Sequence, residues 1–109
     1  MRDYKLYFKD ILEAMESIEQ FVGDMSFEDF KEDDKTASAV IRKFEIIGEA
    51  TKQIPDEVKQ KYSEVPWKEM AGMRDRLIHL YFGVDYNLVW TTIKNRIPVV
   101  KSLIKNITG

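Results

Sequence analysis

The sequence predicts an all-α fold, an up-and-down bundle of four main helices with short extra helices between them. Apolar residues recur at steps of three and four along nearly the whole chain, which is the spacing of one helical face. No segment alternates between apolar and polar residues with a period of two, so no strand is predicted. Aspartate, serine, proline and glycine stand where the apolar patterns begin and end, as helix boundaries require.

The first main helix is predicted from Tyr4 to about Gly23, because glycine is the usual residue just after a helix C-terminus. Ser26 with Asp29 three residues later is a weaker start signal, which predicts one short turn over 27–30. The apolar positions of the first helix share one face: Tyr4, Phe8, Ile11, Met15, Ile18 and Val22.

The second main helix is predicted between the acidic cluster at 32–34 and Pro55. Asp33 or Asp34 can cap its start, since a carboxylate accepts the free backbone N–H groups there. Proline cannot continue the helix, so Pro55 ends it. We expect this helix to lie antiparallel to the first. Its apolar face is Ala37, Val40, Ile41, Phe44, Ile47, Thr51 and Ile54.

Two prolines mark the starts of the next two helices. Pro55 suits the first position of a short helix that runs to Tyr62, and Pro66 repeats this arrangement before Trp67. A third main helix is predicted from Trp67 until Gly83 ends it.

The last main helix is predicted to follow an N-cap at Asp85. Pro98 lies inside this helix, where its ring removes one backbone donor and crowds the carbonyl group of Lys94. A kink is therefore expected at this point. The apolar face is Tyr86, Val89, Trp90, Ile93, Ile97, Val100, Ile104 and Ile107.

The composition limits the class of protein. The chain has 109 residues, of which 44% are hydrophobic and 33% charged, and this predicts one domain over residues 1–109 with a compact core. The absence of cysteine excludes disulfide frameworks, thiolate zinc sites and cysteine nucleophiles. Charges scattered through the first residues, and the lack of an 18-residue apolar run, predict neither a secretory signal nor a membrane span. We therefore expect a cytoplasmic protein.

The net charge of −2 hides an asymmetry along the chain. Residues 1–35 carry 5 basic and 11 acidic side chains, whereas residues 36–109 carry 12 basic and 8 acidic ones. One interpretation of the basic end is a solvated helix whose last turns suit the helix dipole. The other is a surface that faces RNA or a partner. The basic residues from 86 onward, where no acidic residue occurs, are Lys94, Arg96, Lys101 and Lys105.

His79 is the only histidine, so any imidazole chemistry must involve it. Asp75 and Arg76 lie four and three positions before it, on the same helical face, and Asp75 could orient and polarise the ring. Arg74 lies five positions before His79, roughly 140° around an ideal helix. The two side chains converge only if the helix distorts near Gly83 or if a symmetric dimer brings two copies together. The spacing therefore favours a composite site between subunits.

An arginine and a histidine are sufficient for metal-independent RNA cleavage. A guanidinium stabilises charge that develops on a phosphate, and an imidazole can take a proton from a ribose 2′-hydroxyl. The alternative is structural: His79 packs at a helix end, and Arg74 forms an ion pair with Glu49 or Glu69. No metal site or cofactor is predicted, since the acidic residues at 28–34 lack the spacing and the glycine of a calcium loop.

The run from 73 to 90 carries a family resemblance. Arg74, His79 and Tyr81 form the pattern of an arginine, four residues, a histidine, one residue and a tyrosine. With this pattern, the chain resembles the HepT-like branch of the HEPN superfamily over nearly its whole length. Three upstream segments add to the resemblance: Ile47-Gly48-Glu49-Ala50, Pro66-Trp67 and Ala71-Gly72-Met73.

The resemblance implies a small helical homodimer that cleaves RNA without metal in a cleft between protomers, as the toxin of a two-gene module. His79 would be the general acid and base, Arg74 the ligand of the phosphate and the transition state, and Asp75 and Arg76 supporting residues. Tyr81 matches the residue that an MNT-type nucleotidyltransferase antitoxin adenylates, which adds bulk and negative charge beside a cationic cleft. The family often has asparagine at the position of Asp75, so the carboxylate could either tune or weaken catalysis.

Two functions from different classes follow. The first is a ribonuclease toxin that a nucleotidyltransferase neutralises. The second is a non-catalytic HEPN-fold module that binds a nucleotidyltransferase or a nucleotide. The surplus of carboxylates favours the second, because a nuclease gains affinity by neutralising phosphates. The intact set of Arg74, His79 and Tyr81 favours the first.

Overall fold

The computed structural model describes residues 3–78 and 85–108, and within these ranges all regular structure is helical. This confirms the predicted all-α bundle. In chain order the elements are α1 (Tyr4–Val22), α2 (Phe27–Glu32), α3 (Asp34–Gln53), α4 (Asp56–Lys61), α5 (Trp67–Ile78), α6 (Tyr86–Thr91), the π-helical turn η1 (Thr92–Arg96) and α7 (Ile97–Thr108).

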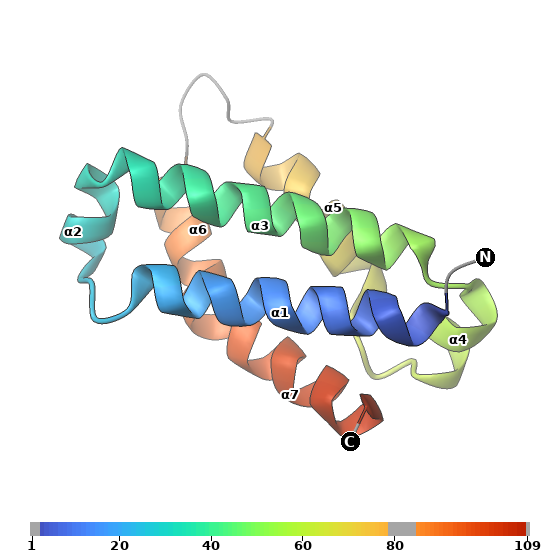
Figure 1. Cartoon of the computed structure of the whole chain (residues 1–109). Helices are drawn as coiled ribbons and strands as arrows, with labels where there is room; N and C mark the ends of the chain where they lie inside the picture. Colours follow the sequence, from blue (N-terminus) through green and yellow to red (C-terminus); the bar gives the residue numbers. More distant parts are fainter. Residues whose placement is uncertain (1–2, 79–84, 109) are drawn as a thin grey trace.

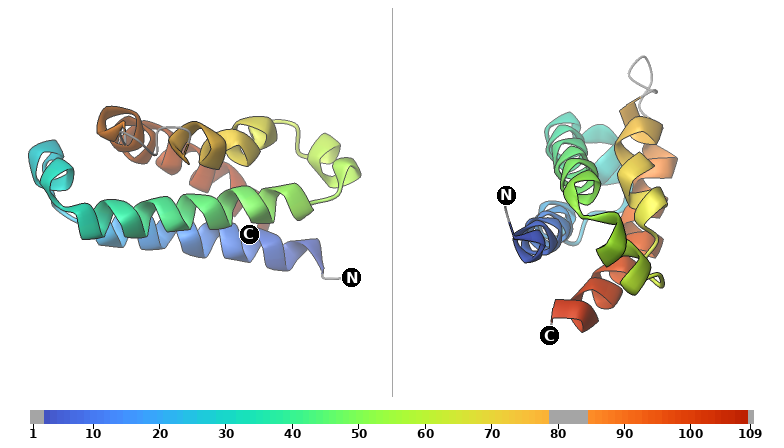
Figure 2. Two further views of the ribbon diagram at one scale, coloured as in Figure 1. Left: turned by 90° about the horizontal axis from the view of Figure 1, so that it is seen from above. Right: turned by 90° about the vertical axis from the view of Figure 1, so that its right-hand side faces the viewer.

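The helices form two layers. α1 and α3 lie side by side and antiparallel, as predicted, and α7 crosses α1 obliquely (Figure 1). Figure 2 shows α5 and the continuous run from α6 through η1 to α7 on one side of the α1–α3 pair. The short helices α2 and α4 lie at opposite ends of this pair.

One apolar core joins the two layers. The predicted faces of α1 and α3 supply nearly half of its buried residues, although Tyr4 and Ile41 are only partly buried. The pattern of buried positions therefore follows the helical period read from the sequence. The largest fully buried side chains are Phe8, Phe30, Phe44, Ile11, Met15, Ile18, Ile47, Ile54, Met70, Ile97, Ile104 and Val40.

The predicted caps of the first helices are present. Gly23 follows α1 with a φ of 51°, a conformation that glycine adopts without strain. Ser26 and Asp29 form a full capping box at the predicted start of α2, and the helix extends two residues beyond the expected turn. Asp33 caps α3 by accepting the backbone N–H of Thr36 at 3.0 Å. This hydrogen bond lowers the pKa of Asp33 below its ordinary value, because it favours the ionised carboxylate.

The middle of the chain agrees with prediction apart from small shifts in boundaries. Pro55 is the N-cap residue of α4 rather than its first residue, since its ψ of 146° is extended. Tyr62 is the C-cap residue of α4. The predicted end of the third helix at Gly83 lies outside the described residues.

The irregularity expected at Pro98 takes the form of a π-helical turn. η1 covers residues 92–96, and the backbone N–H of Ile97 donates to the carbonyl group of Thr92, five residues earlier. In a regular α-helix, the ring of Pro98 would crowd the carbonyl group of Lys94. One wider turn ahead of the proline relieves this crowding while the helix continues.

Candidate active site

The residues singled out by the sequence belong to α5 and to the segment that follows it. Arg74, Asp75 and Arg76 lie within α5, and Asp75 is exposed. The side chains of Arg74 and Arg76 lie outside the described part, as do His79 and Tyr81 as whole residues. The structure therefore fixes the helix on which the motif begins and the helix that follows it.

Trp67 fixes the start of α5. Its indole N–H donates to the carbonyl groups of Lys59 and Tyr62, at 3.1 and 3.0 Å, at the end of α4. Its ring stacks on the ring of Phe8 from α1, with centroids 5.8 Å apart and planes 18° apart. The sequence placed Trp67 only at the start of the third main helix. The bifurcated hydrogen bond was missed because it depends on how the chain turns between α4 and α5.

The burial of α5 sets the orientation of the motif. Met70 is fully buried and Met73 is nearly so, whereas Asp75 is exposed. On an α-helix, residue 74 lies about 40° from Met70 and residue 75 about 140° from it. Position 74 therefore belongs to the flank of the packed face, while Asp75 lies on the solvent side.

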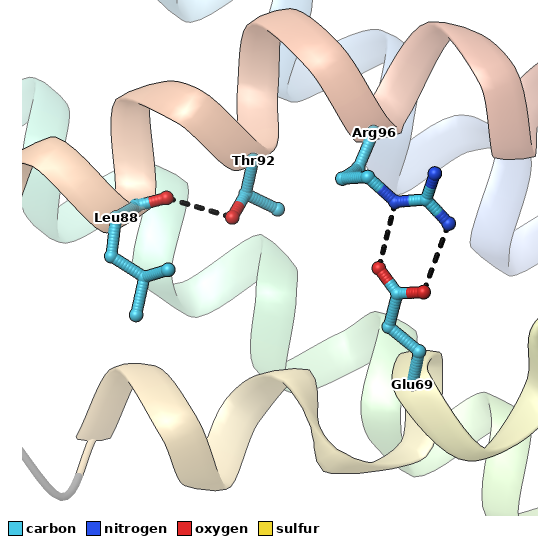
Figure 3. Close-up of polar contacts among 4 residues, drawn as sticks. All are labelled: Glu69, Leu88, Thr92 and Arg96. Carbon is cyan, nitrogen blue, oxygen red and sulfur yellow. Dashed lines mark hydrogen bonds and ion pairs between the residues drawn. The ribbon is translucent and has the colours of Figure 1, made fainter.

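An ion pair links α5 to the last helical run. Arg96 donates from Nε and Nη2 to the two carboxylate oxygens of Glu69, at 2.8 and 2.9 Å (Figure 3). These hydrogen bonds raise the pKa of Arg96, since they favour its charged form. The predicted structural alternative, an ion pair of Arg74 with Glu49 or Glu69, falls on a side chain outside the described part; among the described side chains the partner of Glu69 is Arg96.

The helix that follows the motif is also fixed by short-range contacts. Asp85 caps α6 as predicted, because its carboxylate accepts the backbone N–H of Leu88 at 3.0 Å. One turn further on, the hydroxyl of Thr92 donates to the carbonyl group of Leu88 at 2.7 Å (Figure 3). Described contacts thus hold both α5 before the motif and α6 after it.

The basic side chains near the C-terminal end of the chain interact with other side chains of the same molecule. Lys94 lies over the ring of Trp90, 4.8 Å from its centroid. The other three basic residues contact carboxylates of other helices, in the pairs Arg96–Glu69, Lys101–Glu19 and Lys105–Glu16. The charge asymmetry between the two parts of the sequence therefore draws α7 onto α1. Neither predicted interpretation, a solvated helix or an RNA-facing surface, included these pairs.

The roles of Arg74 as a cation for the phosphate and of His79 as a proton-transfer group stay predictions from the sequence. Across residues 3–78 and 85–108, no group of three or more His, Cys, Asp and Glu side chains could hold a metal ion. None of the helices in these ranges is long and apolar enough to cross a membrane.

Comparisons with known proteins agree on one family. Residues 11–107 match the family model described as ribonuclease HepT-like. A protein of Thermococcus cleftensis named "Probable ribonuclease HepT" is 55% identical over 100 residues, which cover 92% of this chain and 91% of that protein. No solved structure gives a significant match.

Two further relatives carry the name "Putative RNase". One of them, from Methanocaldococcus jannaschii, is 45% identical over 112 residues, covering 99% of this chain and 93% of that protein. The one from Caldanaerobacter subterraneus subsp. tengcongensis is 47% identical over 107 residues, covering 98% and 96%. The family model and these relatives span nearly the whole chain, which therefore belongs to the HepT-like ribonuclease family.

Proposed function

We propose that this chain is a metal-independent endoribonuclease and acts as the toxin of a two-gene toxin–antitoxin module. The observation that carries the proposal is the arginine and histidine of the motif, five residues apart in the sequence and beginning on α5, in a chain of the HepT-like family. Its relatives are named as ribonucleases, which supports RNA as the substrate.

In this proposal His79 and Arg74 divide the chemistry. His79 takes the proton from a ribose 2′-hydroxyl, whose oxygen then attacks the adjacent phosphorus atom. The bond from phosphorus to the 5′-oxygen breaks, and that oxygen receives a proton from the imidazolium of His79, which thus acts as general base and then as general acid. Arg74 binds the phosphate and stabilises the charge that develops on it in the transition state. Asp75 and Arg76 support the histidine from the same helical face.

The site is proposed to be composite, in a cleft between the two protomers of a homodimer. Arg74 and His79 are roughly 140° apart on one ideal helix, so a single straight helix does not direct both side chains to one phosphate. A two-fold axis beside α5 lets Arg74 of one protomer meet His79 of the other.

The test is cleavage of total RNA by the purified protein in the presence of EDTA. We expect cleavage to continue, because neither the proposed proton transfer nor the proposed phosphate ligand needs a metal ion. Product length on a denaturing gel is the measurement. Cleavage that stops in EDTA and returns with added magnesium would contradict the metal-independent mechanism.

Tyr81 is the proposed site of regulation by an MNT-type nucleotidyltransferase antitoxin. Adenylation of its hydroxyl adds bulk and negative charge next to a cationic site, so it should block the binding of phosphate. We expect peptide mass spectrometry to find adenylate on Tyr81 after incubation with the partner enzyme and ATP. The wild-type protein should then lose RNA cleavage, while Tyr81→Phe should stay unmodified. Equal modification of Tyr81→Phe would refute the assignment.

A second candidate function is a HEPN-fold module that binds a nucleotidyltransferase or a nucleotide without cleaving RNA. The acidic balance of the chain favours it, and the ion pairs between α1 and α7 remove further cations from any surface for RNA. A dimeric preparation with unmodified Tyr81 that leaves RNA intact would select this function over the first.

A further inference from the structure

A groove away from the Arg74–His79 motif combines aromatic walls with two lysines. It encloses about 380 Å³ where the first turns of α1, the end of α4 and the last turn of α7 meet. Figure 1 shows α1 beginning beside α4 at one end of the molecule. We call it the Lys5–Lys9 groove, and its lining residues are Tyr4, Lys5, Phe8, Lys9, Leu12, Tyr62 and Ile107.

The charges of α1 are sorted along the helix. Both of its lysines line the groove, and none of its four carboxylates does. Further along α1, Glu16 and Glu19 pair with Lys105 and Lys101 of α7. Residues 86–109 contain no acidic side chain, so α7 offers no carboxylate to the two lysines of the groove.

The contact that Lys9 makes on its own helix does not neutralise the groove. Its ammonium lies 3.9 Å from a carboxylate oxygen of Glu13, and these two side chains are 69% and 63% exposed. An exposed pair of this kind is weak and is screened by salt. Two lysines and no carboxylate therefore line the groove, on a chain whose total charge is negative.

The walls of the groove offer aromatic surface beside this charge. Tyr4 and Tyr62 are partly buried, and Tyr4 packs edge-to-face on Phe8, with centroids 5.6 Å apart. The ammonium group of Lys61, which does not line the groove, lies over the Tyr62 ring, 5.3 Å from its centroid. Aromatic faces that stack bases, next to ammonium groups that neutralise phosphates, are the combination that binds single-stranded nucleic acid.

We infer that the Lys5–Lys9 groove binds a single-stranded part of the RNA substrate outside the site of cleavage. The inference rests on the proposed ribonuclease function. Phe8 in the groove stacks on Trp67 at the start of α5. A helix rises about 1.5 Å per residue, so the motif begins about 10 Å further along α5, a span that a few nucleotides can cross. The groove would thus hold the strand that leads to or from the scissile phosphate.

The experiment is binding of a labelled single-stranded RNA by fluorescence anisotropy at several salt concentrations. The full chain carries His79→Ala in every sample, so that cleavage does not disturb the measurement. With Lys5→Ala and Lys9→Ala together, we expect affinity about tenfold weaker at moderate salt. The slope of log K against log[salt] should become shallower by about 1.4, since each lost phosphate contact on a single strand contributes roughly 0.7.

Matched variants distinguish RNA binding by the groove from a general effect of positive charge and from a loss of folding. The double change Lys5→Arg and Lys9→Arg should keep both the affinity and the slope. Lys31→Ala with Lys35→Ala removes two exposed lysines beside α2, at the other end of α1, and should change neither. Unchanged binding in the Lys5 and Lys9 alanine variant would overturn the inference, and so would an equal loss in the Lys31 and Lys35 variant.

The aromatic wall gives an independent readout. Tyr62→Leu should weaken binding about tenfold, the loss of one stacked base, while the salt slope stays constant. Tyr62→Phe should bind like the parent protein, because it keeps the ring. If RNA binding depends on the groove but total RNA stays intact in EDTA, the groove binds RNA and the proposal of a metal-independent nuclease fails. If RNA is cleaved but these variants bind like the parent, the inference fails alone.

Discussion

Replacing His79 with alanine should lower the rate of RNA cleavage by roughly 10²–10⁴-fold, the range that a positioned general acid or base contributes. No other residue of the chain has an imidazole, so no second side chain has an ordinary pKa near neutrality that could take over the proton transfer. Single-turnover cleavage rates of a defined RNA in EDTA, across the pH range from 5 to 9, measure the effect. The wild-type rate should follow the titration of an imidazole, and the residual rate of the variant should not.

The matched control is Lys68→Ala. Lys68 is an exposed cation near the start of α5, and its removal changes charge without touching the motif. It should cleave RNA at the wild-type rate. Circular dichroism and size-exclusion chromatography should give the same helix content and oligomer size for all three proteins. A His79→Ala protein that keeps cleavage within about threefold of wild type would remove the histidine from the mechanism.

A heterodimer of Arg74→Ala with His79→Ala should recover about half of the wild-type activity per dimer, although each variant alone is nearly inactive. In a composite site, Arg74 of one protomer serves His79 of the other. One site of this heterodimer then carries both substitutions, and the other site carries neither. Coexpression with two different affinity tags, followed by purification on both, isolates the heterodimer for the cleavage assay.

The control is a heterodimer of wild type with His79→Ala, which keeps one intact site whether the two residues come from one protomer or from both. It should show about half of the wild-type activity in either case. If this control is active and the Arg74→Ala with His79→Ala heterodimer is not, both residues of each site belong to the same protomer. That outcome would require a distortion of the helix between Arg74 and His79 instead of a shared cleft.

The local features of the fold were predicted from the sequence because their causes are local. Gly23 after α1 and the capping box of Ser26 and Asp29 act within three or four residues of one another along the chain. The same holds for the caps at Asp33 and Asp85. The helical period also identified the buried faces correctly. Pro98 predicted an irregular helix, while the form that it takes, a π-helical turn, depends on the hydrogen bonds of the neighbouring turns.

The prediction of the candidate site also rests on local information, since the motif lies within one short stretch of the sequence. Arg74, His79 and Tyr81 stand at a fixed spacing, and that spacing alone raised the question of a shared site. The structure adds the placement of α5. The hydrogen bonds of Trp67 fix its start, and the buried Met70 shows which face is packed, so that position 74 lies on the flank of this face.

The partners of charged residues were decided only by the tertiary structure. Arg96 bonds to Glu69 across 27 residues, and Lys101 bonds to Glu19 across 82. The groove likewise assembles Lys5 and Tyr62 from different helices. A periodic pattern states which face of a helix is buried, but not which helix covers it or at what angle. Ion pairs and grooves form along the line where two packed helices meet. Which residues take part therefore depends on how the helices cross, and the order of residues in the sequence does not give this.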